Sequence, residues 1–199
     1  MIKNIIFDFG QVLIHFDPIY MTSRYIKDES DVKIAATVIF DRLYWDKLDA
    51  GTITDEQVVE EIKKRLPRRL HEAAEQAYGN WIYNIPEIKE MRSVIESVKV
   101  KGVRVFVLSN ISRYFAEHAS EISILKLVEK CIFSAVCGYT KPSREMFAYA
   151  CNTYGILPEE TLFIDDSEKN VAGAEAFGIK GYLFDGDVAK LNEFLNKVL

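Results

Sequence analysis

The sequence predicts an α/β protein with a Rossmann-like parallel sheet core and an inserted all-helical cap subdomain. Short apolar runs rich in Val, Ile and Phe recur along the chain, as expected for strands that are buried on both faces. Helical patterns separate the later runs, and this alternation is typical of a parallel sheet with helices on both faces. One long interval after the first run contains helical patterns only, which indicates an insertion.

Five apolar runs are the predicted strands. Each is short, and the first run leads directly to Asp8. The runs span residues 4–7, 103–108, 131–136, 161–164 and 181–184. Three helical segments lie between the later runs, at residues 86–101, 147–154 and 171–177, where apolar residues recur at helical spacing. Pro86 is suited to open the first of these helices, and a glycine follows each segment as a stop signal.

The interval from residue 8 to residue 102 is far too long for a single crossover helix. Its pattern predicts helices at residues 31–43, 54–66 and 69–81. Thr54 and Gln57 form a capping box that marks the start of the second helix. We interpret residues 17–85 as the helical cap and residues 1–16 and 86–199 as the α/β core. Because ligands of open parallel sheets bind at the carboxyl ends of the strands, we expect the cap to stand over that edge.

Length and charge exclude several classes of function. The chain has 199 residues, 49% of them hydrophobic, which is enough for a sizeable core. Its net charge is −5 and it has no basic block, so we expect neither a nucleic-acid nor a membrane-surface partner. No apolar run suits a signal peptide or a membrane span, and the three cysteines form no CxxC pair, so a cytoplasmic location with reduced thiols is expected.

Polar residues follow four of the predicted strands. Taken singly, each has an ordinary explanation as a turn residue, a helix cap or a solvated charge. Since the carboxyl ends of parallel strands share one edge, together they predict a single site that contains a nucleophile, a hydroxyl, a cation and paired carboxylates. These residues are Asp8, then Ser109 and Asn110, then Lys141, and finally Asp165 and Asp166 with Asn170 one helical turn further on.

Four motifs of the chain resemble those of the haloacid dehalogenase-like hydrolase superfamily: FDFGQVL, VFVLSN, the Lys-Pro pair of TKPSREMF, and FIDDSEKNVAGAEAFGI. The resemblance covers the whole chain and is to phosphatases with a helical cap, in particular a subgroup similar to bacterial glucose-1-phosphate phosphatases. It implies a Mg²⁺-dependent phosphatase that hydrolyses a small phosphorylated metabolite, such as a sugar phosphate, through an aspartyl-phosphate.

The resemblance also implies a role for each candidate residue. Asp8 would be the nucleophile, while Ser109, the Asn110 backbone and Lys141 would hold the phosphoryl group. The Mg²⁺ ligands would be Asp8, the Gly10 carbonyl and Asp166, with Asp165 and Asn170 in support. These roles suit the chemistry, because a carboxylate that attacks a phosphate needs cations to neutralise the repulsion. Mg²⁺ also prefers a few carboxylate and carbonyl oxygens and retains several waters.

Gly10 departs from the commonest pattern of the family, in which a second Asp at this position protonates the leaving oxygen and later activates water. Loss of a general acid–base typically lowers the rate by ~10²–10⁴. Three explanations stay open: an acidic leaving group such as an anomeric sugar phosphate, an acid supplied by the cap or its flap, or a protein that binds phosphate without turnover. His15 and Asp17 are the alternative acids nearest in sequence.

Rival functions differ in what they require of these residues. A 2-haloacid dehalogenase also uses an Asp nucleophile but works without a metal, so Asp165 and Asp166 favour phosphoryl transfer. A phosphomutase needs the acid–base group that Gly10 lacks. A non-catalytic phosphate-binding or regulatory protein is left open, and phosphate release separates it from an enzyme. In the cap, Trp45 and Tyr44 are expected to pack in the core and Arg42 to be solvated. No residue there identifies the substrate.

Overall fold

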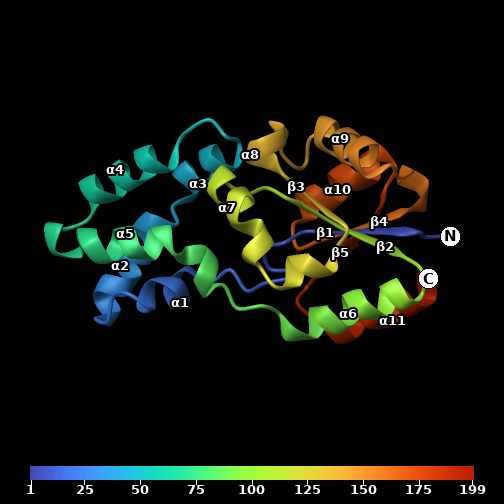
Figure 1. Cartoon of the computed structure of the whole chain (residues 1–199), viewed down its shortest axis with the longest axis horizontal. Coiled ribbons are helices and arrows are strands. Elements are labelled where there is room, and N and C mark those ends of the chain that lie inside the picture. Colours follow the sequence, from blue (N-terminus) through green and yellow to red (C-terminus); the bar gives the residue numbers. More distant parts are fainter.

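The structure is a computed structural model that describes residues 1–199. Its centre is a five-stranded sheet in the order β3-β2-β1-β4-β5, and every neighbouring pair is parallel (Figure 1). The strands are β1 (Asn4–Phe7), β2 (Arg104–Ser109), β3 (Lys130–Phe133), β4 (Thr161–Asp165) and β5 (Lys180–Leu183). This confirms the predicted α/β class with a Rossmann-like parallel sheet.

Helices surround the sheet and fill the interval after β1. The core helices are α6 (Lys89–Val100), α7 (Arg113–His118), α8 (Ser134–Cys137), α9 (Arg144–Tyr154), α10 (Glu168–Phe177) and α11 (Val188–Val198). The interval contains α1 (Pro18–Ser23), α2 (Glu29–Ile39), α3 (Arg42–Asp49), α4 (Asp55–Arg65) and α5 (His71–Gly79). Short 3₁₀ turns occur at Arg68–Leu70, Trp81–Asn84, Ala119–Glu121, Ile124–Leu127 and Pro158–Glu160. No helix is both long enough and apolar enough to cross a membrane.

Side chains of the sheet alternate between two apolar layers, as the sequence of β1 illustrates. Ile5 and Phe7 belong to the cluster that includes the inner faces of α6 and α11, whereas Ile6 belongs to the cluster formed with α9 and α10. All three side chains are fully buried, and full burial of such a side chain contributes about 1.5–3 kcal/mol. The continuous apolar run is therefore the pattern of a strand covered on both faces.

Three predicted boundaries were wrong, each for a local reason. The third strand ends at Phe133 rather than at residue 136, because the chain turns into α8 there. The helix expected to open at Pro86 begins at Lys89, since the Pro86 carbonyl accepts a hydrogen bond from the His15 backbone. The helix expected over residues 31–43 ends at Ile39, and the Asp41 side chain caps the start of the next helix. The sequence analysis also missed α1, most of α3, α7, α8 and α11.

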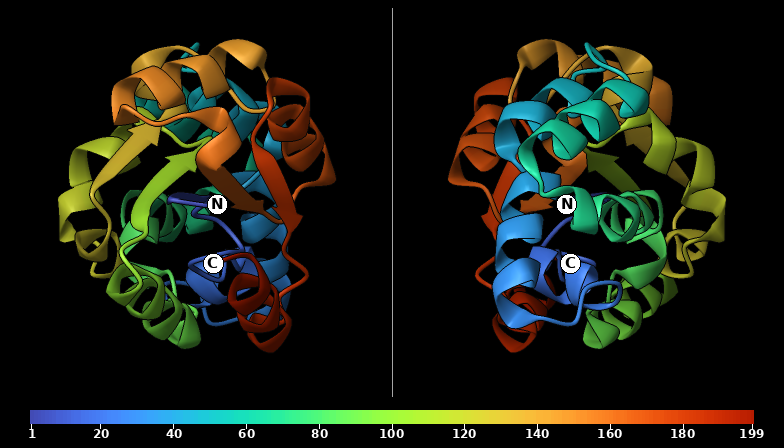
Figure 2. Two further views of the ribbon diagram at one scale, coloured as in Figure 1. Left: turned by 90° about the vertical axis from the view of Figure 1, so that its right-hand side faces the viewer. Right: turned by 90° about the vertical axis from the view of Figure 1, so that its left-hand side faces the viewer.

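The helices from α1 to the 3₁₀ turn at Trp81–Asn84, here called the helical insertion, stand at the carboxyl ends of the strands, at the left of Figure 1 and in front of the sheet in the right-hand view of Figure 2. A chain of ring contacts joins it to the core: Trp45 packs on Trp81, and Trp81 stacks on Phe115 of α7. The centroid distances are 5.1 and 5.6 Å. Trp45 and Trp81 belong to the same buried cluster as β1, so the insertion shares an apolar core with the sheet.

Candidate active site

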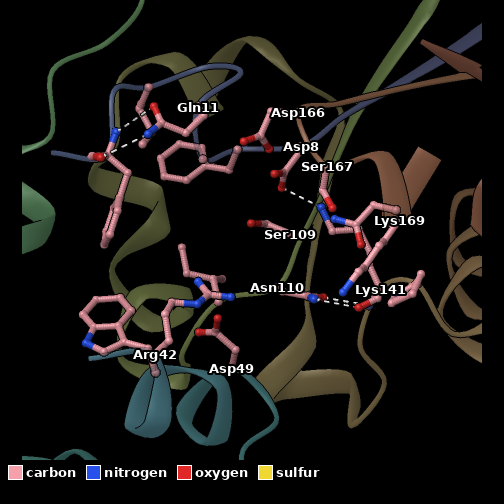
Figure 3. A pocket seen from close by; sticks show the side chains of 18 of the residues that line it. Asp8, Gln11, Arg42, Asp49, Ser109, Asn110, Lys141, Asp166, Ser167 and Lys169 are labelled. Carbon is pink, nitrogen blue, oxygen red and sulfur yellow. Dashed lines mark hydrogen bonds and ion pairs between the residues drawn. The ribbon is translucent and has the colours of Figure 1, made fainter. Parts of the chain in front are cut away.

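A cavity of about 420 Å³ lies between the strand ends and the helical insertion (Figure 3). It contains seven of the eight residues that the sequence analysis assigned to the site: Asp8, Gly10, Ser109, Asn110, Lys141, Asp166 and Asn170. The eighth, Asp165, is fully buried beneath the cavity and does not line it. Residues from four separate segments of the chain, namely after β1, at the end of β2, before α9 and after β4, therefore meet at one edge of the sheet.

Lys141 is a buried cation held between two carboxylates. Its Nζ lies 2.7 Å from Asp8 Oδ1 and 2.7 Å from Asp165 Oδ2, and the residue is 4% exposed. Burial opposes the charge, but Asp8 and Asp165 outweigh it and raise the pKa of Lys141. The ammonium group is therefore charged at neutral pH, beside the carboxylate at the end of β1.

Asn110 fixes the backbone that carries Lys141. Its Oδ1 accepts from the Lys141 N–H at 2.8 Å, and its Nδ2 donates to the Lys141 carbonyl at 2.9 Å. The peptide bond from Lys141 to Pro142 is cis. Helix α10 closes on the same loop at Gly173, where a Cβ would lie 2.7 Å from the Pro142 carbonyl oxygen. The position of the buried cation thus depends on one amide side chain and one glycine.

Asp165 is fully engaged with protein donors. Besides Lys141, it accepts from the Ser167 N–H at 2.8 Å and from Asn170 Nδ2 at 3.0 and 3.1 Å. Asp8, in contrast, has only Lys141 as a side-chain partner. Burial, opposed by Lys141, raises the pKa of Asp8 to about 6. Of the two carboxylates that contact Lys141, Asp8 is the one left free to react.

The oxygen atoms near Asp8 suit a hard divalent cation. Carboxylate oxygens of Asp8, Asp165 and Asp166 lie within 4.8 Å of one another. Asp166 is exposed, and no protein group donates to the Gly10 carbonyl. Because the oxygens of Asp165 are taken by other donors, Asp8, Gly10 and Asp166 are the groups that fit Mg²⁺, which binds few protein oxygens and retains waters.

The loop after Gly10 is held in an unusual backbone conformation. Gln11 has φ 57°, a left-handed value that is uncommon for a residue other than glycine and that occurs at functional sites. Its side chain holds the loop closed, since Nε2 donates to the Phe16 carbonyl at 3.2 Å and Oε1 accepts from the Phe16 N–H at 3.3 Å. A Cβ at Gly10 would meet no atom within 4 Å, so crowding does not explain the glycine.

The alternative acids His15 and Asp17 do not line the cavity. His15 is exposed, and the Asp17 side chain caps α1 by accepting from the Tyr20 N–H at 2.9 Å. The insertion instead contributes Arg42, Trp45, Asp49 and Trp81 to the cavity lining. Trp45 is buried and Arg42 is largely exposed, as expected, but both also reach the cavity.

Two named relatives are phosphatases. The chain is 28% identical over 197 residues to a D-ribitol-5-phosphate phosphatase of Bacteroides thetaiotaomicron, covering 92% of this chain and 91% of the relative. It is 26% identical over 180 residues to a sesquiterpene phosphatase of Aspergillus oryzae, covering 90% and 88%. The two relatives act on different phosphates, so neither name specifies the substrate here.

Solved structures share the fold over almost the full chain. A HAD-like hydrolase of Porphyromonas gingivalis superposes with a TM-score of 0.72 at 26% identity, covering 98% of both chains. A HAD family enzyme of Bacteroides thetaiotaomicron in complex with magnesium and inorganic phosphate gives 0.73 at 21% identity, covering 96% of this chain and 99% of that one. Residues 2–178 match the haloacid dehalogenase-like hydrolase family. The chain belongs to that family.

Proposed function

We propose that this protein is a Mg²⁺-dependent phosphatase that hydrolyses a small phosphomonoester through a phosphorylated Asp8. The observation that carries the proposal is the environment of Asp8, which directly follows the buried strand β1, lines the cavity and pairs with the buried Lys141 at 2.7 Å. The phosphatases among the relatives and the magnesium and phosphate bound by a structural neighbour support the same reading.

The residues around Asp8 account for the steps of such a reaction. Lys141 neutralises charge beside the carboxylate, so that an anionic ester can approach Asp8. Ser109 ends β2 on the cavity wall, where its hydroxyl can donate to a phosphoryl oxygen. Mg²⁺ held by Asp8, Gly10 and Asp166 would add a second neutralising charge. Attack by Asp8 then gives an acyl phosphate, which water hydrolyses.

The remaining cavity wall points to the class of ester. Helical insertion residues provide both aromatic and polar surface there, with Trp45 and Trp81 beside Arg42 and Asp49. A cavity of about 420 Å³ leaves room for a small carbon skeleton next to the phosphate. We therefore propose a small sugar or polyol phosphate as substrate, with residues 17–85 acting as the cap that encloses it.

Phosphate release from a panel of esters tests the function. With Mg²⁺, the purified protein is expected to release phosphate from at least one of D-ribitol 5-phosphate, sugar 1- and 6-phosphates and 4-nitrophenyl phosphate, and EDTA is expected to abolish release. Asp166→Asn should weaken the activation by Mg²⁺, whereas the exposed carboxylate Asp185 can be changed to Asn without effect. Full activity in EDTA would contradict the metal site, and binding of phosphate without any release would leave a non-catalytic protein.

A further inference from the structure

Asp49 is a buried acid on the part of the cavity wall that the insertion contributes. It is the last residue of α3, it is 8% exposed, and its Oδ1 has no hydrogen-bond partner in the protein. In Figure 3 the side chain projects from α3 into the cavity, on the other side of Ser109 from Asp8. Buried polar groups almost always have a partner, so an orphan carboxyl that faces a cavity indicates a ligand there.

The core holds Asp49 in place although the residue belongs to the insertion. The fully buried Ser134 hydroxyl donates to the Asp49 carbonyl and accepts from the Ile111 N–H at 2.9 Å. Gly51 continues this contact, since a Cβ there would lie 3.2 Å from the Ala135 carbonyl oxygen. These contacts fix the end of α3 to the segment that follows Ser109, so Asp49 has a defined position relative to the reacting groups.

Asp49 holds a proton at neutral pH. Burial raises the pKa of Asp49 to about 8, and Arg42, Asp46, Asp8 and Lys141 are the charged groups that act on it with opposing signs. Helix α8 packs on α3 and contains no charged residue. The thiol of its last residue, Cys137, contacts the carbonyls of Ser134 and Tyr139. A protonated carboxyl in this position can donate where an ionised one could only accept.

The direction of the reaction places the leaving group away from Asp8. In phosphoryl transfer the attacking and leaving oxygens lie roughly in line on opposite sides of phosphorus. The only carboxyl groups that line the cavity are Asp8, Asp166 and Asp49, and no His, Tyr or Cys lines it. Because Asp166 lies beside Asp8, Asp49 is the acid available on the side of the leaving group.

We propose that Asp49 is the general acid–base of the reaction and replaces the carboxyl group that Gly10 lacks. This rests on the proposed phosphatase function. As an Asp8 oxygen bonds to phosphorus, the ester P–O bond breaks, its electron pair stays on the leaving oxygen, and that oxygen takes the Asp49 proton. In the second half, a water oxygen bonds to phosphorus, the bond from phosphorus to Asp8 breaks, and a proton of the water returns to Asp49.

A pair of esters of similar size tests this role in the Asp49→Asn variant. Benzyl phosphate has a poor leaving group that needs the proton, whereas 4-nitrophenyl phosphate releases an acidic phenol that does not. Asp49→Asn is expected to lower kcat/KM, which reports the transfer of the phosphoryl group to Asp8, by ~10²–10⁴ for benzyl phosphate and by less than about 10-fold for 4-nitrophenyl phosphate. Glu72→Gln, an exposed acid on α5 of the insertion, is the control and should change neither.

The outcomes separate catalysis from structure and from binding. Equal losses of kcat/KM on both esters would overturn the proposal. If Asp49→Asn does not fold, the native protein supplies the test, because kcat/KM for benzyl phosphate should fall above pH about 8 while kcat/KM for 4-nitrophenyl phosphate does not. Parallel pH profiles would overturn the proposal. A native protein inactive on both esters would overturn the proposed function, and this assignment with it.

Discussion

At the scale of single residues, Lys141 combines a structural and a chemical role. It is the only cation in contact with Asp8 and Asp165, both of which are buried. Buried ion pairs gain little net stability, because desolvation offsets the attraction, but removal of one partner leaves an uncompensated charge. The arrangement is therefore better explained by the need for charge next to Asp8 than by a contribution to folding.

We expect Lys141→Met to destabilise the protein by about 3–5 kcal/mol at pH 8. The pKa of Asp8 is already raised to about 6 with Lys141 present, and loss of the cation raises it further. A folded-state pKa above the unfolded value means that the folded chain holds a proton that the unfolded chain releases, so stability falls as pH rises. The deficit should thus be smaller at pH 5 than at pH 8 in urea unfolding.

Lys190→Met is the matched control for this comparison. Lys190 pairs with Asp185 at 2.7 Å, but its side chain is 63% exposed, so solvent screens the pair and little change is expected. Equal urea midpoints for Lys141→Met and Lys190→Met would show that the loss of Lys141 leaves no uncompensated buried charge.

At the scale of elements, the packing of α10 on the loop of Lys141 and Pro142 joins two parts of the site. Gly173 allows this approach, since an added Cβ would lie 2.7 Å from the Pro142 carbonyl oxygen and 2.8 Å from its Cβ. Helix α10 also carries Asn170, which donates to Asp165. The glycine therefore has a packing role within a helix, at a cost in helix propensity of about 1 kcal/mol.

Gly173→Ala is expected to destabilise the fold by about 1–3 kcal/mol, because the loop or the helix must move, and to lower phosphate release by displacing Lys141. Gly79→Ala at the end of α5 is the control: a Cβ there meets nothing within 4 Å, so it should leave stability unchanged or raise it. Urea unfolding and phosphate release of both variants are the measurements. A Gly173→Ala variant as stable and active as the native protein would contradict the close approach.

At the scale of the whole molecule, the features that could be predicted from the sequence are those that depend on residues close together in the chain. The strands that lead to Asp8, Ser109 and Asp165 were predicted because each apolar run and the polar residue after it are adjacent in sequence. Asp49 was missed for a physical reason. Its burial comes from contacts such as that with Ser134, which lies 85 residues away, and nothing nearby in sequence distinguishes it from the surface acids of the insertion.

The helical insertion was likewise predicted as helical and as standing over the carboxyl ends of the strands, but the contacts that join it to the core were not predicted. The ring contacts from Trp45 through Trp81 to Phe115 join segments that helical periodicity treats separately. They bring Arg42, Trp45 and Asp49 to the cavity that Asp8 faces. The nucleophile side of the site follows from strand ends, whereas the substrate side depends on tertiary packing.

Direct detection of a phosphorylated Asp8 tests the central claim. The protein would be mixed with a ³²P-labelled phosphomonoester and Mg²⁺ and quenched in acid during turnover, and the ³²P bound to the protein would be counted. A second sample would be treated with borohydride, which releases the phosphate and reduces the acyl carbon of the modified aspartate to the alcohol of homoserine, and the altered peptide identified by mass spectrometry. The account predicts protein-bound ³²P, homoserine in the place of Asp8 after reduction, and neither of these in Asp8→Asn, which should also release no phosphate. Phosphate release by the native protein without label at Asp8, or undiminished release by Asp8→Asn, would contradict it.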